Sequence, residues 1–210
     1  MVEAIPLEAQ ALDPIPSPDQ IEMQTSEMVS EANYYGLGFK TFRLPTEIHN
    51  RMLRQFRSCT ADFRPEGAID AIKTTQPQVI PALYFEDHAF NRSVLEELQP
   101  LHEAWCGMGL EQSACYGFRV YQRGSYLFNH VDRTRTHIIS STVCIDSDVD
   151  EPWPLYIADI EGNAFTVDMT PGDAVFYEGA SLVHGRPWPL NGDWYAGMFV
   201  HYRPTGMARR

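Results

Sequence analysis

Apolar and β-branched residues in the second half of the chain gather into short runs, and turn-forming residues separate these runs. Runs of a few such residues are typical of strands rather than of helices. The segments Glu161-Gly162-Asn163, Pro171-Gly172-Asp173 and Asn191-Gly192-Asp193 favour tight turns between them. Short strands with frequent turns over about 90 residues predict a barrel or jelly roll. The predicted strands are residues 137–145, 154–160, 164–168, 174–177, 181–184 and 194–202.

The first half of the chain shows a helical spacing of its apolar positions instead. Thr46, after Pro45, is predicted to cap a first helix, whose apolar face is formed by Ile48, Leu53 and Phe56. Asn91 is predicted to cap a second helix, whose apolar stripe is formed by Val94, Leu95, Leu98, Leu101 and Trp105. We expect both helices to buttress one side of the barrel.

The expected organisation is a single domain preceded by a loosely ordered arm. Residues 1–33 are rich in Pro, Glu, Gln and Ser and have no sustained periodicity. Residues 34–210 form the domain, with helical support in 34–115 and the barrel core in 116–204. Within the support, 79–85 is predicted to be a strand and 71–77 a loop that covers the mouth of the barrel. The predicted fold class is mainly β, a cupin-like double-stranded β-helix with flanking helices.

Composition narrows the classes of function. A chain of 210 residues with 44% hydrophobic content can bury one real core. The net charge of −12 argues against nucleic acid as the main partner. No apolar run is long enough to span a membrane, and the start of the chain lacks the pattern of a secretory signal. The scattered cysteines fit free thiols in a reducing cytoplasm; they are Cys59, Cys106, Cys115 and Cys144.

The most informative chemistry is a His-x-Asp pair followed by a distant histidine. His130 and Asp132 stand two residues apart, so on a strand both side chains leave the same face. His184 comes at the end of another predicted strand. Two imidazoles and one carboxylate on one face of a metal leave about three positions open, as in the facial triad of non-heme Fe(II) oxygenases. The sequence therefore predicts that these three residues bind Fe(II). A surface or core role for His184 is the alternative.

Taken together, Tyr121, Gly124, His130-Val131-Asp132, Pro171-Gly172-Asp173 and His184-Gly185 resemble the catalytic domain of prolyl 4-hydroxylase-like Fe(II)/2-oxoglutarate-dependent dioxygenases. The resemblance extends from about Tyr116 to Pro204. It implies Fe(II), the co-substrates 2-oxoglutarate and O2, and ascorbate as an optional reductant. It also implies that Tyr121 donates a hydrogen bond to 2-oxoglutarate, although a role in the core is an equal alternative for this tyrosine.

One feature departs from the family pattern. Members of the family usually carry Lys or Arg nine or ten residues after the distal histidine, where it pairs with the far carboxylate of 2-oxoglutarate. Those positions are Asp193 and Trp194 here, and neither lysine of the chain lies in the predicted core. Any cationic anchor from the core must therefore be one of its arginines, which are Arg119, Arg123, Arg133, Arg135, Arg186 and Arg203. The planar fork of an arginine suits this role, since it binds a carboxylate through two hydrogen bonds. Arg186 shares strand parity with His184 and is the first candidate; Arg119, in step with Tyr121, is the second.

The resemblance implies hydroxylation of an unactivated C–H bond, with a prolyl or another amino-acid or peptidyl side chain as the substrate. Related halogenases have a small residue at the position of Asp132, so the carboxylate favours hydroxylation. The substrate is expected to be a small molecule or peptide, with no nucleic acid or membrane partner. The alternative is a non-catalytic, metal-binding, cupin-like module for ligand binding or interaction, which the missing cation at 193 and 194 would support.

Overall fold

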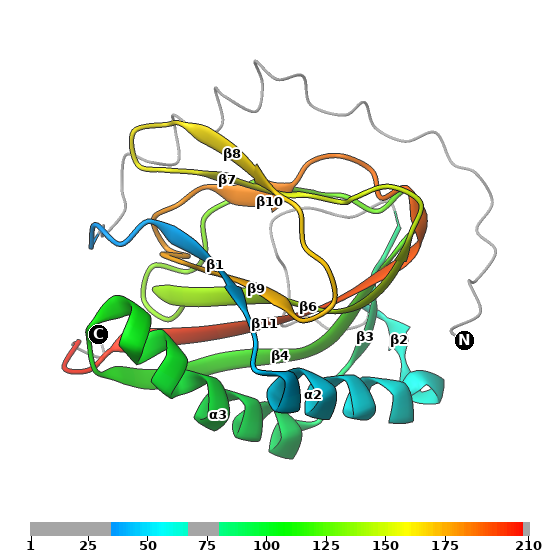
Figure 1. The fold of residues 1–210 in the computed structure, drawn as a ribbon, viewed down its shortest axis with the longest axis horizontal. Helices are drawn as coiled ribbons and strands as arrows, with labels where there is room; N and C mark the ends of the chain where they lie inside the picture. Colours follow the sequence, from blue (N-terminus) through cyan, green and yellow to red (C-terminus); the bar gives the residue numbers. More distant parts are fainter. Residues whose placement is uncertain (1–34, 67–79, 208–210) are drawn as a thin grey trace.

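A computed structural model of the chain describes residues 35–66 and 80–207. The predicted N-terminal arm (1–33) and the predicted covering loop (71–77) lie outside these residues. The described chain is mostly β-structure with two long helices against one side (Figure 1).

The larger of two antiparallel sheets has seven strands. Their order is β1-β9-β6-β11-β4-β3-β2. Their bounds are β1 Phe39–Arg43, β9 Asp173–Tyr177, β6 Ile139–Val149, β11 Gly192–Pro204, β4 Leu110–Gln122, β3 Leu83–Phe85 and β2 Arg64–Pro65. β11 lies at the centre of this sheet, and it pairs along most of its length with β4 on one side and β6 on the other.

The smaller sheet has four strands in the order β5-β10-β7-β8. Their bounds are β5 Leu127–His130, β10 His184–Arg186, β7 Leu155–Ala158 and β8 Ala164–Val167. From β4 to β11 the chain moves back and forth between the two sheets, which face each other in Figure 1. This is the predicted double-stranded β-helix. The hydrogen bonding of the described residues forms two separate sheets rather than one continuous barrel.

Two helices, α2 Thr46–Ser58 and α3 His88–Cys106, cover the outer face of the larger sheet (Figure 1). Both predicted caps were wrong. Thr46 is the first helical residue after an N-cap at Pro45, and no side chain caps α2. In α3 the carboxylate of Asp87 accepts hydrogen bonds from the amides of Ala89 and Phe90, each 3.0 Å long. Asn91 lies inside α3 and donates instead to the carbonyl of Cys115 at 3.0 Å.

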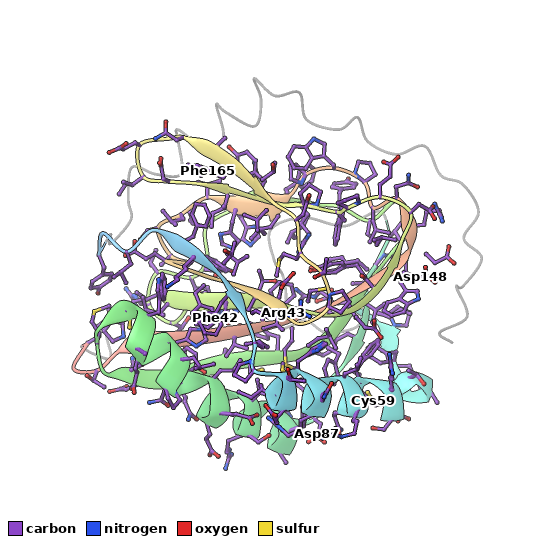
Figure 2. All side chains as sticks on the ribbon, viewed as in Figure 1. Phe42, Arg43, Cys59, Asp87, Asp148 and Phe165 are labelled. Carbon is purple, nitrogen blue, oxygen red and sulfur yellow. The ribbon has the colours of Figure 1, made fainter. Side chains whose placement is uncertain are left out.

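The core has two main parts, one on each face of the larger sheet (Figure 2). Between this sheet and the helices, Phe56 packs edge-on against Phe118 with ring centroids 5.5 Å apart. Between the two sheets lies an apolar cluster rich in tyrosine and tryptophan, which includes Tyr121, Trp153, Tyr177 and Tyr195. The second cluster borders the residues that carry the candidate chemistry.

All four cysteines are buried and free, as predicted. No helix of the described residues is both long and apolar enough to cross a membrane. The strand predicted at 79–85 is present as the shorter β3. β1, which pairs along its length with β9, was not predicted, because its alternation of exposed and half-buried residues is weak.

Candidate metal centre

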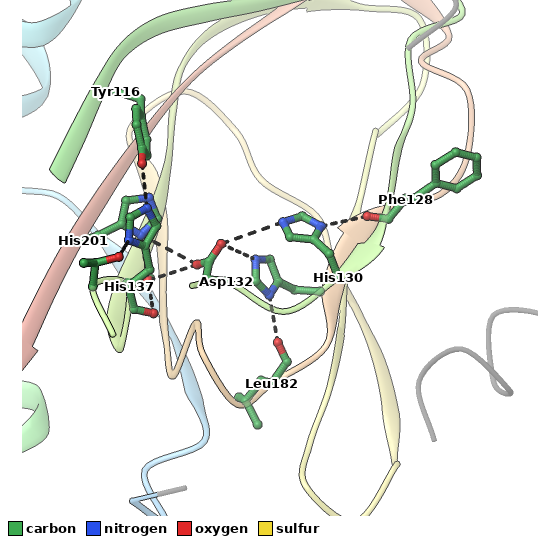
Figure 3. A network of polar contacts seen from close by, with 10 residues as sticks. Tyr116, Phe128, His130, Asp132, His137, Leu182 and His201 are labelled. Carbon is green, nitrogen blue, oxygen red and sulfur yellow. Dashed lines mark hydrogen bonds and ion pairs between the residues drawn. The ribbon is translucent and has the colours of Figure 1, made fainter. Parts of the chain in front are cut away.

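His130, Asp132 and His184 converge between the two sheets (Figure 3). His130 ends β5 and His184 begins β10, and the two are direct cross-strand partners. The chain leaves β5 just before Asp132, whose amide donates to the carbonyl of Gly179 at 2.7 Å. One ligand atom from each of the three lies within 4.8 Å of the others. The predicted convergence is confirmed, although His184 begins its strand rather than ending one.

Both imidazoles are oriented by their own backbone. Nδ1 of His130 lies 2.8 Å from the carbonyl of Phe128, and Nδ1 of His184 lies 2.8 Å from that of Leu182. A carbonyl oxygen only accepts, so each Nδ1 carries the proton and each Nε2 is left as a free lone pair. Each Nε2 is 3.8 Å from Oδ1 of Asp132. This arrangement, with the ring held by its second nitrogen, is typical of histidines that bind metals.

Burial sets the protonation of the centre. It lowers the pKa of His130 and of His184 to about 4, so both imidazoles are neutral near pH 7. It raises the pKa of the Asp132 carboxyl to about 6, against the opposing effects of His130 and of a hydrogen bond from Ser140. A buried carboxylate beside two lone pairs is costly without a cation. The donor set therefore fits a divalent metal of the kind that imidazole and carboxylate favour.

Arg186 lies two residues beyond His184, with its guanidinium buried among aromatic rings. It donates to the carbonyl of Trp153 and, at 2.8 Å, to the hydroxyl of Tyr195. Its Cζ is 4.7 Å from the ring centre of Trp153 and 4.4 Å from that of Tyr195. No carboxylate in ranges 35–66 and 80–207 forms an ion pair with it. The structure thus holds a buried cation whose counter-ion is not supplied by the described chain.

Arg119, the second candidate, already has an acidic partner. Its guanidinium pairs with Glu66 and lies 5.2 Å from the ring centre of Phe199. The Nε of Arg119 and the hydroxyl of Tyr121 are buried, and neither makes a hydrogen bond of ordinary geometry with the described residues. The two groups interact electrostatically: burial raises the pKa of Tyr121, and the charge of Arg119 opposes this.

Asp193 and Trp194 stand where the family usually has a cation, and both side chains point away from the metal centre. Asp193 is exposed and pairs with Arg123 at 3.0 Å. Trp194 packs on the helix side of the larger sheet, with its ring 5.8 Å from that of Phe56. The neighbouring residue Tyr195 is the one that faces inward, where its hydroxyl meets Arg186.

Three residues that the sequence did not single out lie beside Oδ2 of Asp132, the oxygen on the side away from the two imidazoles. The hydroxyl of Ser140 lies 3.2 Å from Oδ2 of Asp132, and Nδ1 of His201 lies 3.7 Å from the same oxygen. Gly179 leaves room for this carboxylate, because a Cβ there would stand 2.3 Å from Oδ2. No signal in the sequence marks this pair, because Ser140 and His201 become neighbours only as register partners on β6 and β11.

No protein-family model matches the chain, and no curated protein matches it by sequence. Many solved structures match its fold. A prolyl-4-hydroxylase from Pseudomonas putida has a TM-score of 0.59 at 15% identity, covering 89% of this chain and 100% of its own. A 2OG-Fe(II) oxygenase family oxidoreductase from Burkholderia pseudomallei has a TM-score of 0.55 at 10% identity, covering 82% and 92%.

A third match, HygX from Streptomyces hygroscopicus with nickel, 2-oxoglutarate and hygromycin B bound, has a TM-score of 0.55 at 14% identity, covering 80% of this chain and 84% of its own. At these identities the likeness establishes the fold. The chain has the double-stranded β-helix of the 2OG-Fe(II) oxygenases, and its His-Asp-His cluster lies between the two sheets of that fold.

Proposed function

We propose that the protein is an Fe(II)- and 2-oxoglutarate-dependent dioxygenase that hydroxylates an unactivated C–H bond. The observation that carries this proposal is the pairing of two features on one strand. His184 belongs to a cluster suited to Fe(II), and Arg186, on the same strand, is a buried cation without an anionic partner among the described residues. A metal site alone would serve many functions, whereas a metal site beside an unneutralised buried arginine fits a ligand that carries a carboxylate.

The span between these features suits 2-oxoglutarate. Two residues along a strand rise about 6.6 Å, which is comparable with the length of a short dicarboxylate. The end with the 2-oxo group would meet the metal, and the far carboxylate would meet Arg186, where an unpaired charge is otherwise costly. The hydroxyl of Tyr121, whose main charged neighbour is Arg119, makes no hydrogen bond of ordinary geometry with the described residues and is available to donate to the same ligand. Arg119 is the weaker candidate, because Glu66 already neutralises it.

Bound Fe(II) would supply an oxidant formed from O2 while 2-oxoglutarate is converted to succinate and CO2, and this oxidant would replace C–H by C–OH. The chain's own residues position this chemistry and shield it from water. The side chain of His184 is 5% exposed and that of His130 is 26% exposed. A substrate therefore reaches the centre from the His130 side, while the surroundings of Arg186 stay closed. A carboxylate at Asp132, in place of a small residue, favours hydroxylation over halogenation.

The substrate class that we favour is a prolyl or another amino-acid or peptidyl side chain. A prolyl hydroxylase from Trichoplax adhaerens with a bound peptide fragment shares the fold. HygX carries hygromycin B, and another neighbour is the epimerase SnoN. Proteins with this fold thus take peptides and small molecules, and the product has to be identified by experiment.

The test is succinate release from 2-oxoglutarate by purified protein with Fe(II), O2 and ascorbate. Candidate amino acids and peptides are added in turn, and the molecular masses of the products are measured by mass spectrometry. We expect turnover only with both Fe(II) and O2, and a product heavier by one oxygen atom. Turnover without O2, or a halogenated product, contradicts the proposal. Tight metal binding with no succinate from any candidate would favour the non-catalytic module.

A further inference from the structure

The two oxygens of the Asp132 carboxylate have different surroundings. Oδ1 faces the two imidazoles, at 3.8 Å from each Nε2. Oδ2 faces the opposite way, towards the larger sheet, where Ser140 and His201 approach it (Figure 3). One oxygen is thus placed for a metal, and the other is held by the protein.

A directed chain of hydrogen bonds ends on Oδ2. Nδ1 of His201 lies 2.8 Å from Oγ of Ser140, and Oγ lies 3.2 Å from Oδ2 of Asp132. A carboxylate oxygen only accepts, so the Ser140 hydroxyl donates to it and His201 donates to Ser140. The competing acceptor for the Ser140 hydroxyl, the carbonyl of His137, lies slightly farther away at 3.3 Å.

The His201 ring is fixed in this position by its neighbours. It is 3% exposed and stacks on the ring of His137 with centroids 3.9 Å apart. Nε2 of His137 lies 2.8 Å from the hydroxyl of Tyr116, whose ring meets His201 edge-on at 5.5 Å. A ring packed in this way cannot turn its Nδ1 away from Ser140 without disturbing the whole stack. Gly179 completes the arrangement, because any side chain there would occupy the space of Oδ2.

We infer that Ser140 and His201 are positioning residues that restrict Asp132 to binding the metal through Oδ1 alone. A carboxylate can bind a metal through one oxygen or through both. Binding through both would take a second coordination position, and the three protein ligands leave about three positions in total. By holding Oδ2, Ser140 and His201 keep those positions for 2-oxoglutarate and O2. The functional consequence rests on the proposed function, whereas the one-oxygen binding of Asp132 does not.

The variants are designed to release Oδ2 with little other change. Ser140→Ala removes the donor, and His201→Leu removes the group that orients it. His201→Asn is the conservative variant, because its amide nitrogen stands where Nδ1 stood and can still donate. Ser141→Ala is the matched control: it deletes a hydroxyl from the next residue of the same strand, and that hydroxyl has no partner in the part of the chain that the structure describes.

The first measurement uses the metal alone. Crystal structures of the Co(II)-loaded protein, with Co(II) absorption in solution, report how Asp132 is bound. We expect one oxygen in the parent, in Ser141→Ala and in His201→Asn, and two oxygens in Ser140→Ala and His201→Leu. Two oxygens in the parent, or one oxygen in every variant, overturns the inference. A parent protein that binds no metal overturns both this inference and the proposed function.

The second measurement is the Kd of 2-oxoglutarate for the Ni(II)-loaded proteins, beside the Kd of Ni(II) itself. We expect Ser140→Ala and His201→Leu to bind 2-oxoglutarate about 10-fold more weakly, because the freed Oδ2 of Asp132 competes with the 2-oxoglutarate oxygens for positions on the metal; this is the lower end of the effect on activity of losing an outer partner of a metal ligand. Ni(II) binding should be retained. A parallel loss of both affinities would show that the two residues merely maintain the structure, against the inference. A parent that binds Ni(II) but no 2-oxoglutarate sinks the proposed function, while the Co(II) structures still decide how Asp132 binds.

Discussion

Replacing Arg186 by methionine separates the metal site from the 2-oxoglutarate site. Methionine keeps a long, flexible side chain that packs against Trp153 and Tyr195, and it removes the guanidinium that donates to Tyr195 at 2.8 Å. The metal cluster shares no hydrogen bond with Arg186 among the described residues. The variant is therefore expected to bind metal normally and to bind 2-oxoglutarate more weakly, because the far carboxylate has lost its cationic partner.

The size of the effect follows from linkage. At 2-oxoglutarate equal to about 100 times its Kd, the Ni(II)-loaded parent gains about 2.7 kcal/mol of stability. For a chain of this length about 1 kcal/mol corresponds to about 2–4 °C, so the melting temperature should rise by about 5–11 °C. Losing one partner of a buried charge pair costs about 2–5 kcal/mol, which weakens binding at least about 30-fold. At the same concentration the variant then gains at most about 0.9 kcal/mol, or about 2–4 °C.

The assay is thermal unfolding of the Ni(II)-loaded proteins with and without 2-oxoglutarate. Arg203→Met is the control, because Arg203 is also mostly buried but pairs with Glu111 away from the centre. The control should keep the full 2-oxoglutarate shift. If Arg186→Met also kept it, while Arg119→Met lost it, the ordering of the two arginines would be wrong. If all three kept it, both Arg186 and Arg119 would be refuted as the anchor.

Further outcomes are expected elsewhere in the molecule. Asp132→Ala should abolish succinate release under all conditions, measured with Fe(II) in excess. Burial lowers the pKa of His102 to about 4; the unfolded chain takes up this proton below about pH 6.5 and the native chain does not, so stability is lost as pH falls. Between about pH 6.5 and about pH 5, the free energy of unfolding of His102→Phe should therefore fall by about 2 kcal/mol less than that of the parent, as measured by urea unfolding. An unchanged dependence of this free energy on pH would contradict the prediction.

The sequence was sufficient for the features that depend on strand parity and turn chemistry. The double-stranded β-helix followed from short runs and turns. The grouping of His130, Asp132 and His184 was also predicted, although Asp132 lies beyond the end of β5 and His184 begins β10 instead of ending a strand. The arginine candidates also followed from parity, since Arg186 does lie inside beside Tyr195.

Features that depend on three-dimensional packing were not predictable. Asp87 and Asn91 are both good cap residues. Asp87 caps α3, whereas the side chain of Asn91 donates to a buried acceptor, the carbonyl of Cys115. The support of Asp132 by Ser140 and His201 joins strands β6 and β11, which meet only through a register set by the whole sheet. The pairing of Arg119 with Glu66, which argues against it as the anchor, likewise spans 53 positions of the chain.

The most direct test of an Fe(II)- and 2-oxoglutarate-binding centre is an anaerobic titration followed by visible absorption. A 2-oxo acid that chelates Fe(II) gives a visible charge-transfer band, which neither component gives alone. We predict that this band grows with 2-oxoglutarate to one equivalent in the parent. It should need more Fe(II) in Asp132→Ala, which lacks one of the three ligands, and a much higher 2-oxoglutarate concentration in Arg186→Met. A parent that binds one Fe(II) yet develops no band at saturating 2-oxoglutarate would contradict the assignment.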